Sequence, residues 1–231
     1  MNIPLVTIIT PTTGKKNLYK LIESVDKQSI PSVHILLWDD KREDDFLYPD
    51  SKTMEVKQPY SLRSESRYSI IIPGSFVKGQ AYGSALRSIG LMAANTPYVT
   101  FVDDDVWWES NHLETMVKTL EDSKKEWCFC VRKIWDSNRE YLGEDHFESV
   151  GNSPERKVPY EMVDNNCMIF TQKFGVSGAC LYRNTENYND DRLFYSFLKQ
   201  YAGEPVKTNL ATINQICPRR LEEMFRQYCK K

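Results

Sequence analysis

Three consecutive carboxylates follow a short apolar run near the middle of the sequence, and this stretch constrains the fold more than any other. Residues 98–102 are mostly β-branched or aromatic and follow the turn signal Asn95–Thr96–Pro97, which predicts a buried strand. The carboxylates that come directly after this strand are Asp103, Asp104 and Asp105. Because ligands bind at the carboxyl ends of strands in open α/β sheets, we expect hard oxygen ligands at that edge.

Adjacent carboxylates repel one another, so the acidic run needs either solvent or a cation. A solvated loop is the ordinary explanation for acids that follow a strand. A divalent cation held among the carboxylates is the functional alternative. An EF-hand calcium loop is disfavoured, because residues 103–108 lack the glycine of that motif.

Composition and charge indicate a globular chain without a nucleic-acid footprint. The 231 residues include 30 Lys and Arg and 32 Asp and Glu, which gives a net charge of −2, so no nucleic-acid partner is expected. No run approaches the ~18–20 apolar residues of a membrane span, and residues 1–5 lack the pattern of a signal peptide. The six cysteines form no metal-type pair, so we expect reduced, buried thiols in a cytoplasmic protein.

The first forty residues predict a strand, a helix and a second strand. Residues 5–10 form the first strand, the turn 11–14 follows, and a helix begins at Asn17. The apolar positions of this helix recur at helical spacing: Leu18, Leu21, Ile22 and Val25. The second strand, residues 33–38, ends in Asp39 and Asp40. This βαβ unit predicts parallel strands, so the acidic pair lies at the same sheet edge as the later triplet.

Helices and strands alternate along the rest of the chain. Strands are predicted at residues 68–73, 127–131, 168–170 and 176–182. Helices are predicted to begin at Ser84, Ser110, Asn189 and Pro218. Their expected apolar faces are Ala85, Leu86, Ile89 and Ala93; Leu113, Met116, Val117 and Leu120; Leu193, Phe194, Phe197, Leu198 and Tyr201; Leu221, Met224, Phe225 and Tyr228. Gly90 costs about 1 kcal/mol relative to alanine inside a helix, which indicates close packing or a ligand.

Four motifs in this order resemble the family 2 glycosyltransferases. The motifs are the strand 6–12 with its helix and the second strand to Asp40, the helix segment 83–90, the acidic strand 96–107, and the segment 189–194. The helix segment is similar to the family's Ala-Arg-Asn-x-Gly pattern, and the acidic strand is similar to its DXD motif. The resemblance covers most of the first ~130 residues and extends more loosely to about residue 200.

The resemblance implies an inverting enzyme with the GT-A fold, an α/β class with a mostly parallel twisted sheet flanked by helices and a Rossmann-like N-terminal half. A single domain is expected, with a nucleotide-sugar-binding half at residues 1–108, an acceptor-binding half at 109–210 and a C-terminal helix at 211–231. The sequence departs from the family pattern at four places. These are Thr13, Ser88, Asp190 and the long insertion 41–77.

The resemblance also implies a site for a nucleotide and a divalent cation. A cation neutralises the diphosphate that leaves during transfer, and Mn²⁺ or Mg²⁺ suits oxygen ligands. Asp105 is implied as the metal ligand, and Asp103 is implied as a ligand of the ribose or of the metal. The further nucleotide-binding residues are Pro11, Thr12, Thr13, Asp40, Arg87 and Asp104. The alternative for Arg87 is an exposed helix arginine.

An inverting transfer needs a base that takes the proton of the acceptor hydroxyl. Asp191 matches the second acid of the family's later pair and is the first choice, with Asp190 as the second. The alternative is that either acid caps the helix and interacts with its dipole. Trp107 is a candidate for stacking on a sugar, against a core role, and Asp164 is a candidate for facing the acceptor, against a plain turn.

The implied partners are a nucleotide-diphosphate sugar, with UDP first and GDP or dTDP as alternatives, and a glycan or lipid-linked acceptor. Bacterial surface polysaccharide synthesis is the expected setting, and peripheral contact with the inner face of a membrane through residues 218–231 is left open, as is the oligomeric state. Two other functions compete with transfer. A sugar nucleotidyltransferase is disfavoured because residues 11–16 offer one glycine where it needs a glycine-rich loop, and a non-catalytic binding domain is disfavoured by the intact acids.

Overall fold

The large sheet of the protein is built around the first strand. The computed structural model describes residues 3–14, 17–39, 67–72, 83–154, 161–182 and 190–229. The seven strands of this sheet are β1 (Val6–Thr12), β2 (Ser32–Asp39), β3 (Arg67–Ile72), β4 (Tyr98–Phe101), β6 (Trp127–Phe129), β9 (Met168–Thr171) and β10 (Val206–Lys207). Their order is β10-β6-β9-β4-β1-β2-β3. Only β9 runs antiparallel to its neighbours, which confirms a mostly parallel sheet.

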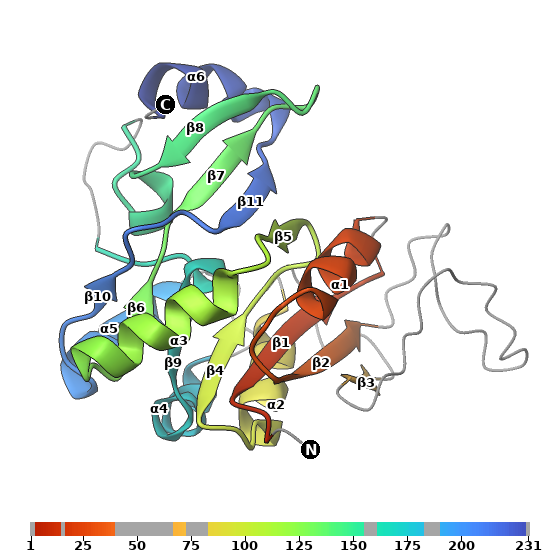
Figure 1. Ribbon diagram of the computed structural model, residues 1–231, viewed down its shortest axis with the longest axis vertical. Coiled ribbons are helices and arrows are strands. Elements are labelled where there is room, and N and C mark those ends of the chain that lie inside the picture. The colour runs from red at the N-terminus through yellow and green to blue at the C-terminus, as the bar shows by residue number, and fades with distance from the viewer. Residues whose placement is uncertain are drawn as a thin grey trace, which may run out of the picture.

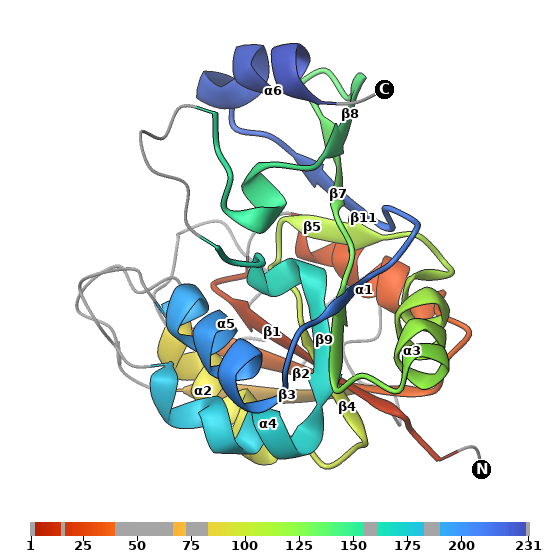
Figure 2. The same ribbon diagram turned by 90° about the vertical axis from the view of Figure 1, so that its left-hand side faces the viewer.

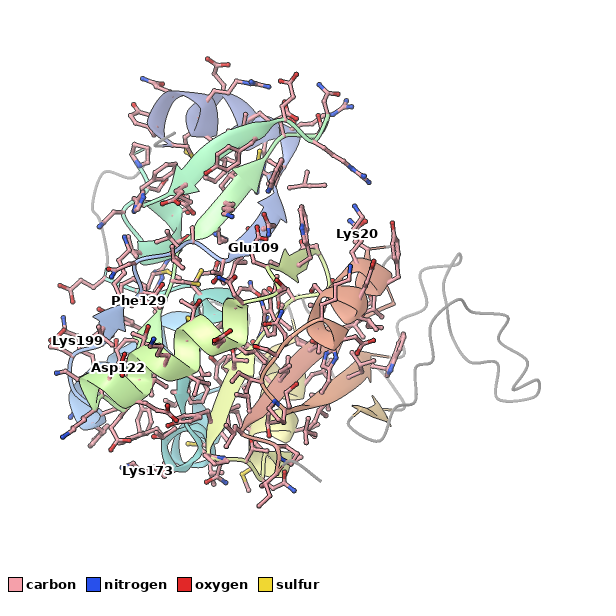
Figure 3. The ribbon with its side chains drawn as sticks, in the orientation of Figure 1. Lys20, Glu109, Asp122, Phe129, Lys173 and Lys199 are labelled. Carbon is pink, nitrogen blue, oxygen red and sulfur yellow. The ribbon has the colours of Figure 1, made fainter. Side chains whose placement is uncertain are left out.

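A second, smaller sheet lies beyond the carboxyl ends of the large sheet's strands (Figure 1). Its strands are β5 (Val106–Trp108), β7 (Arg132–Trp135), β8 (Tyr141–Asp145) and β11 (Ile213–Ile216), in the order β5-β11-β7-β8. The chain enters it directly, from β4 into β5 and from β6 into β7. Glu109 lies at this junction (Figure 3), where its carboxylate accepts from Lys133 Nζ at 2.9 Å and from Asn214 Nδ2 at 3.2 Å.

Helices cover both faces of the large sheet, as an α/β fold requires. The helices are α1 (Leu18–Asp26), α2 (Ser84–Ala93), α3 (His112–Ser123), α4 (Gln172–Gly178), α5 (Asp190–Tyr201) and α6 (Glu222–Tyr228), with 3₁₀ turns at Glu148–Val150, Asn165–Cys167, Ala179–Leu181 and Arg219–Leu221. Figure 2 shows α1 and α3 on one face and α2, α4 and α5 on the other. In the part of the chain that the structure describes, no helix has the length and apolarity needed to cross a bilayer.

The helical spacing of apolar residues predicts two helices correctly. In α1 the buried residues include Leu18, Leu21, Ile22 and Val25, and in α3 they include Leu113, Met116, Val117 and Leu120. Asn111, and not Ser110, occupies the N-cap position of α3. None of the six cysteines forms a disulfide in the structure. Four of them are buried, as predicted, whereas Cys180 is exposed and Cys229 is half-buried.

The helix α2 buries a different set of residues from the one predicted. Ser84 is its first helical residue, and Gly83 occupies the N-cap position with a φ of 78°, a conformation that glycine adopts at no steric cost. The buried face is Ser84, Leu86, Arg87, Gly90 and Leu91, whereas Ala93 is exposed. The prediction failed because an arginine and a glycine, which no apolar pattern selects, both point toward the sheet.

Gly90 allows α2 to approach the sheet closely. A Cβ added at this position would lie 2.5 Å from Ile9 Cγ2 and 2.9 Å from Leu37 Cδ1. Close packing, and not a ligand, therefore explains the glycine that the sequence places in this helix. We expect Gly90→Ala to lower the free energy of unfolding by about 1–2 kcal/mol, because an overpacking cost of about 2–3 kcal/mol outweighs the gain in helix propensity of about 1 kcal/mol.

Urea unfolding measures this effect. The matched control is Met92→Ala, since Met92 lies on the same helix with 65% of its surface exposed. Equal or higher stability of the Gly90→Ala protein would contradict the packing explanation.

The strand predicted at residues 176–182 is wrong. This segment is the end of α4 followed by the 3₁₀ turn Ala179–Leu181. A Cβ added at Gly178 would lie 2.5 Å from Phe194 Cε2, and one at Gly175 would lie 2.9 Å from Phe170 Cε2. Small residues bring this short helix onto two aromatic rings, so tertiary packing decides its conformation against local propensity.

Short strands and partly buried helices account for the remaining differences. The strand β8 lies in the polar stretch 136–161, where no strand was predicted. The strand β11 lies in the segment 211–231, which was predicted as a helix. On α5, Leu193 and Tyr201 are 48% and 62% exposed, while Tyr195 is buried in their place. In α6, Met224 and Phe225 are buried and Tyr228 is 45% exposed. This helix packs onto the small sheet and its flanking turn, where Phe225 lies 5.3 Å from Phe147 between ring centroids.

Candidate active site

The first acid of the triplet is held by two side chains from other elements. Asp103 forms an ion pair with Arg87 of α2, a residue that is only 5% exposed. Asn166 Nδ2 donates to Asp103 Oδ2 at 2.9 Å, and the backbone N–H of Asp103 donates to Asn166 Oδ1 at 2.6 Å. Burial lowers the pKa of Arg87, but the ion pair with Asp103 and the further charges of Tyr182 and Asp164 together raise that pKa above its ordinary value. The exposed-arginine alternative for Arg87 is therefore wrong.

The second acid joins the triplet to the end of β1. Thr12 Oγ1 donates to Asp104 Oδ2 at 2.7 Å and accepts from the backbone N–H of Gly14 at 2.9 Å. Asp104 is 4% exposed, so its carboxylate fixes the loop between the two sheets. Asp105 is half-buried at the start of β5.

The first strand and the start of α2 meet beside these acids. Pro11 and Thr12 belong to β1, not to the predicted turn, and Thr13 follows the strand. Gly83 packs directly on Pro11, since an added Cβ there would lie 2.6 Å from Pro11 Cβ. Asp40 lies outside the described residues, although β2 runs parallel to β1 up to Asp39.

A chain of hydrogen bonds leads from Asp103 into the second half of the protein. Asn166 Nδ2 donates to Asp164 Oδ1 at 3.0 Å, so one amide links Asp103 with Asp164. Asp164 Oδ2 in turn accepts from Arg132 Nη1 at 3.0 Å. Arg132 also pairs with Asp145 at 2.8 Å, and that carboxylate is fully buried. Asp164 is thus part of a connected polar network, which a plain turn does not need.

Asp164 and Asp191 line one cavity of about 300 Å³. The described part of its lining includes the basic residues Arg132 and Arg192. It also includes Gln215, which comes from the small sheet. Burial raises the pKa of Asp191, and the negative charge of Asp164 raises it further. A carboxylate with a raised pKa in a cavity is suited to take a proton.

The two acids at the start of α5 have different surroundings. Asp190 is 5% exposed and does not line the cavity, whereas Asp191 does. Asp191 Oδ1 accepts from the backbone N–H of Arg192 at 2.8 Å, so it also interacts with the helix terminus. Burial raises the pKa of the nearby Tyr182 well above its ordinary value, and the charges of Asp191, Asp190 and Asp103 raise it further. These three carboxylates therefore share one neighbourhood.

Trp107 and Asp164, the two predicted acceptor residues, do not meet. Trp107 lines a different cavity, between α1 and the small sheet, which shares no residue with the cavity of Asp164 and Asp191. Its neighbour Trp108 is 4% exposed and belongs to the main core, so one of the two tryptophans has the core role.

Sequence reasoning missed Arg132 and Asn166. Arg132 directly follows the apolar residues 127–131, the same pattern of a charge after a buried strand that singled out Asp103. That signal could have identified it. Asn166 had no comparable signal, because its role depends on a 3₁₀ turn that brings it against a strand end 63 residues earlier in the chain.

Comparisons with known proteins agree on one family. Residues 7–188 match Glycosyl transferase family 2. Over 167 residues, or 71% of this chain, the sequence is 28% identical to glycosyltransferase GlyA of Streptococcus pneumoniae serotype 4, and the chain spans 21% of that protein's length.

Two crystal structures of S. aureus TarS residues 1–349 share the fold. The first has a TM-score of 0.64 at 16% sequence identity, and the match covers 92% of this chain and 60% of the TarS chain. The second, a complex with UDP-GlcNAc, has a TM-score of 0.63 at 16% identity and covers 93% of this chain and 59% of its own. The family match extends over most of the chain, and the sheet is mostly parallel, as expected, so this chain belongs to glycosyl transferase family 2 and has the GT-A fold.

Proposed function

We propose that this domain transfers a sugar, with inversion, from a nucleotide-diphosphate sugar to a hydroxyl group of a glycan or a lipid-linked acceptor. One observation carries the proposal. Asn166 links the strand-end acid Asp103 to Asp164, and Asp164 lines the same cavity as Asp191. A polar network thus connects the proposed donor-binding edge of the sheet to a cavity that is also lined by Asp191, a carboxylate able to accept a proton.

UDP is the proposed nucleotide, with GDP and dTDP as alternatives. Crystal structures of S. aureus TarS, which shares this fold, contain UDP-GlcNAc and UDP. In this chain, the end of β1 with Pro11, Thr12 and Thr13, together with Asp40, is the proposed wall for the base and ribose. Arg87 and Asp103 are the proposed contacts of the ribose and phosphates.

Asp103 and Asp105 fit a divalent cation whose remaining ligands come from the sugar donor. Asp105 and Asp103 supply hard oxygen atoms at the carboxyl end of a buried strand, which is the chemistry that Mn²⁺ and Mg²⁺ require. Within the described residues, no three side chains of His, Cys, Asp or Glu are placed to hold a metal ion by themselves. A cation held by one or two carboxylates takes its remaining ligands from substrate phosphates. When bound, it neutralises the charge of the departing diphosphate.

We assign the proton transfer of an inverting reaction to Asp191. A single displacement at the anomeric carbon needs a base on the acceptor side, and Asp191 lines the cavity there with a pKa raised by burial. Asp190 is the second candidate. Synthesis of a bacterial surface polysaccharide is the proposed setting; GlyA and TarS, to which this chain is similar, are both bacterial proteins. Peripheral membrane contact through residues 218–231 is a further proposal.

A thermal-shift experiment with UDP tests the nucleotide site. UDP with Mn²⁺ is expected to raise the unfolding midpoint, since a ligand at 100 times its Kd adds about 2.7 kcal/mol to the folded state. UDP or Mn²⁺ alone is expected to have a much smaller effect. Asp105→Asn is expected to remove the dependence on Mn²⁺.

The matched control is Asp122→Asn, because Asp122 is an exposed acid on α3, away from the site (Figure 3). Full metal-dependent stabilisation of the Asp105→Asn protein would show that Asp105 is not a ligand of the metal. Normal nucleotide binding without transfer or donor hydrolysis, compared with and without EDTA, would favour a non-catalytic binding domain.

A further inference from the structure

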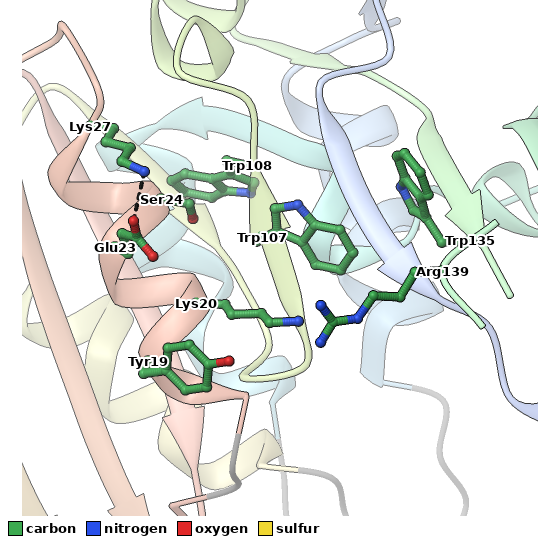
Figure 4. A pocket seen from close by; sticks show the side chains of 9 residues that line it. All are labelled: Tyr19, Lys20, Glu23, Ser24, Lys27, Trp107, Trp108, Trp135 and Arg139. Atoms are coloured by element: carbon green, nitrogen blue, oxygen red, sulfur yellow. Dashed lines mark hydrogen bonds and ion pairs between the residues drawn. The ribbon is translucent and has the colours of Figure 1, made fainter. Parts of the chain in front are cut away.

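A cleft of about 540 Å³ lies between α1 and the small sheet, apart from the cavity of Asp164 and Asp191 (Figure 4). One side is formed by residues of α1, and the other by β5, the end of β7 and the turn that follows it. Its lining combines three tryptophans with several cations. This combination of side chains is unusual for an exposed surface and indicates a ligand.

Aromatic rings form one wall of the cleft. The half-buried rings of Trp107 and Trp135 lie 6.4 Å apart between centroids, with an interplanar angle of 37°. Trp135 Nε1 donates to Asn214 Oδ1 at 2.9 Å, which fixes the orientation of that ring. The ring of Tyr141 continues the row at 5.3 Å from Trp135. Partly exposed rings held in this way present flat apolar faces to a ligand.

Two cations that have no acidic partner among the described residues face each other across the cleft. Lys20 Nζ lies 5.5 Å from the centroid of the Trp107 ring, and Figure 4 shows it pointing toward the guanidinium of Arg139. Among the described residues, no carboxylate lies within ion-pair distance of either cation, whereas the nearby Lys27 is paired with Glu23 at 2.7 Å. Burial and the charge of Arg139 both lower the pKa of Lys20. An anion between the two cations would relieve this repulsion.

The backbone holds Arg139 in place over the cleft. Arg139 has a φ of 65°, a left-handed conformation that is unfavourable for a residue with a Cβ. The turn is fixed by the buried Asp136 carboxylate, which accepts from the backbone N–H groups of Asn138 at 2.9 Å and Glu140 at 2.8 Å. The second cation is therefore presented by a rigid turn.

We propose that this cleft binds an anionic saccharide, a sugar that carries a phosphate or carboxylate group. The sugar ring stacks on Trp107 and Trp135, while the anionic group lies between Lys20 and Arg139. A neutral sugar would leave the cations uncompensated, and an inorganic anion would leave the aromatic wall unused. The proposal concerns binding alone and does not depend on the transfer reaction proposed above.

NMR spectroscopy of the tryptophan indole groups tests this proposal. The chain contains five tryptophans, so their indole N–H signals can be assigned by single Trp→Phe variants. Titration with glucose 6-phosphate is expected to shift the signals of Trp107 and Trp135 to saturation. Glucose and inorganic phosphate, added separately, are expected to bind at least about tenfold more weakly, since each lacks one of the two contacts.

The double variant Lys20→Met, Arg139→Gln is expected to weaken glucose 6-phosphate binding at least about tenfold. Lys27→Met is the matched control, because Lys27 lines the same cleft but is already paired. Unchanged unfolding midpoints exclude misfolding. Absence of saturable shifts at Trp107 and Trp135, or equal binding by the double variant, would overturn the proposal. Tighter binding of UMP than of glucose 6-phosphate would overturn the saccharide assignment in favour of a nucleotide.

A further variant separates this proposal from the proposed function. The Asp105→Asn protein is expected to bind glucose 6-phosphate in the cleft with unchanged affinity, because Asp105 does not line it. Loss of UDP binding with intact cleft binding would refute only the nucleotide site. Intact UDP binding without cleft binding would refute only the saccharide site.

Discussion

Asp191→Asn is expected to lower the rate of sugar transfer by about 10²–10⁴-fold, the usual contribution of a general base. The amide keeps the shape of the side chain but cannot take the proton of the acceptor hydroxyl. Asp191 lies in the first turn of α5, where asparagine is tolerated, so the unfolding midpoint is expected to change little. Nucleotide binding is expected to survive, because Asp103 and Asp105 lie on a different element. The measurements are transfer rate, donor affinity and melting temperature.

The parallel variant Asp190→Asn decides between the two acids. Asp190 is 5% exposed and does not line the cavity, so its loss is expected to affect stability more than transfer. If Asp190→Asn alone abolishes transfer, the roles are exchanged. If both proteins transfer normally, the base is elsewhere, and Asp164 becomes the next candidate.

The pH dependence of transfer provides an independent check. Burial raises the pKa of Asp191 above the ordinary value of an aspartate, and Asp164 raises it further. A base works only when it is deprotonated, so the rate is expected to fall as the pH drops through this raised pKa. The acidic limb of the profile should therefore lie above the pH at which an ordinary aspartate titrates. An acidic limb that stays in place in the Asp191→Asn protein would assign it to another group.

Arg132→Met is expected to have the largest effect on stability, a loss of about 3 kcal/mol. Removing one partner of a buried ion pair costs roughly 3–5 kcal/mol because the other charge remains buried. The lower end applies here, since Asp145 keeps the backbone N–H groups of Phe147, Glu148 and Ser149 as donors. In a chain of this size, this loss corresponds to a fall in melting temperature of roughly 6–12 °C.

Two further variants make the Arg132 result interpretable. Arg132→Lys keeps the charge but loses the planar fork that reaches Asp145 and Asp164 together, so an intermediate loss is expected. Lys173→Met removes an ion pair with Glu126 in which the Lys173 side chain is 61% exposed, and it is expected to cost at most about 1 kcal/mol. A melting temperature of Arg132→Met equal to that of Lys173→Met would contradict a stabilising role for the network.

The sequence predicts the parallel half of the fold because its signals there are local. A buried strand, a helix with one apolar face and a turn each depend on neighbouring residues, and β1, α1 and β2 follow that pattern. The strands β5, β10 and β11 have two to four residues each, and their partners lie far away in the chain. Such strands form only because another segment pairs with them, so no pattern within their own residues predicts them.

The residues of the candidate site also differ in whether the local sequence could identify them. Asp103 could be selected because it is an acid at the end of a predicted strand, whereas the choice of Asp191 depends on the resemblance to the family's later acidic pair. Arg87 could be selected only through the resemblance, since a buried arginine on a helix breaks the apolar pattern. Asn166 could not be selected, because a single amide that links two carboxylates is a property of the three-dimensional arrangement alone.

The pairing of β5 with β11 determines when the strand that follows the acidic loop reaches its final position. Trp108 pairs with Ile213, and the nearby hydrogen bond between His112 and Thr212 joins residues 100 positions apart. Contacts of such long range form slowly, since the loop between them must close first. On a ribosome, the acids emerge long before the strand that supports them. Thr12, Arg87 and Asn166 can hold Asp103 and Asp104 before that point. The strand that follows Asp105 gains its partner only when residues 213–216 have left the exit tunnel.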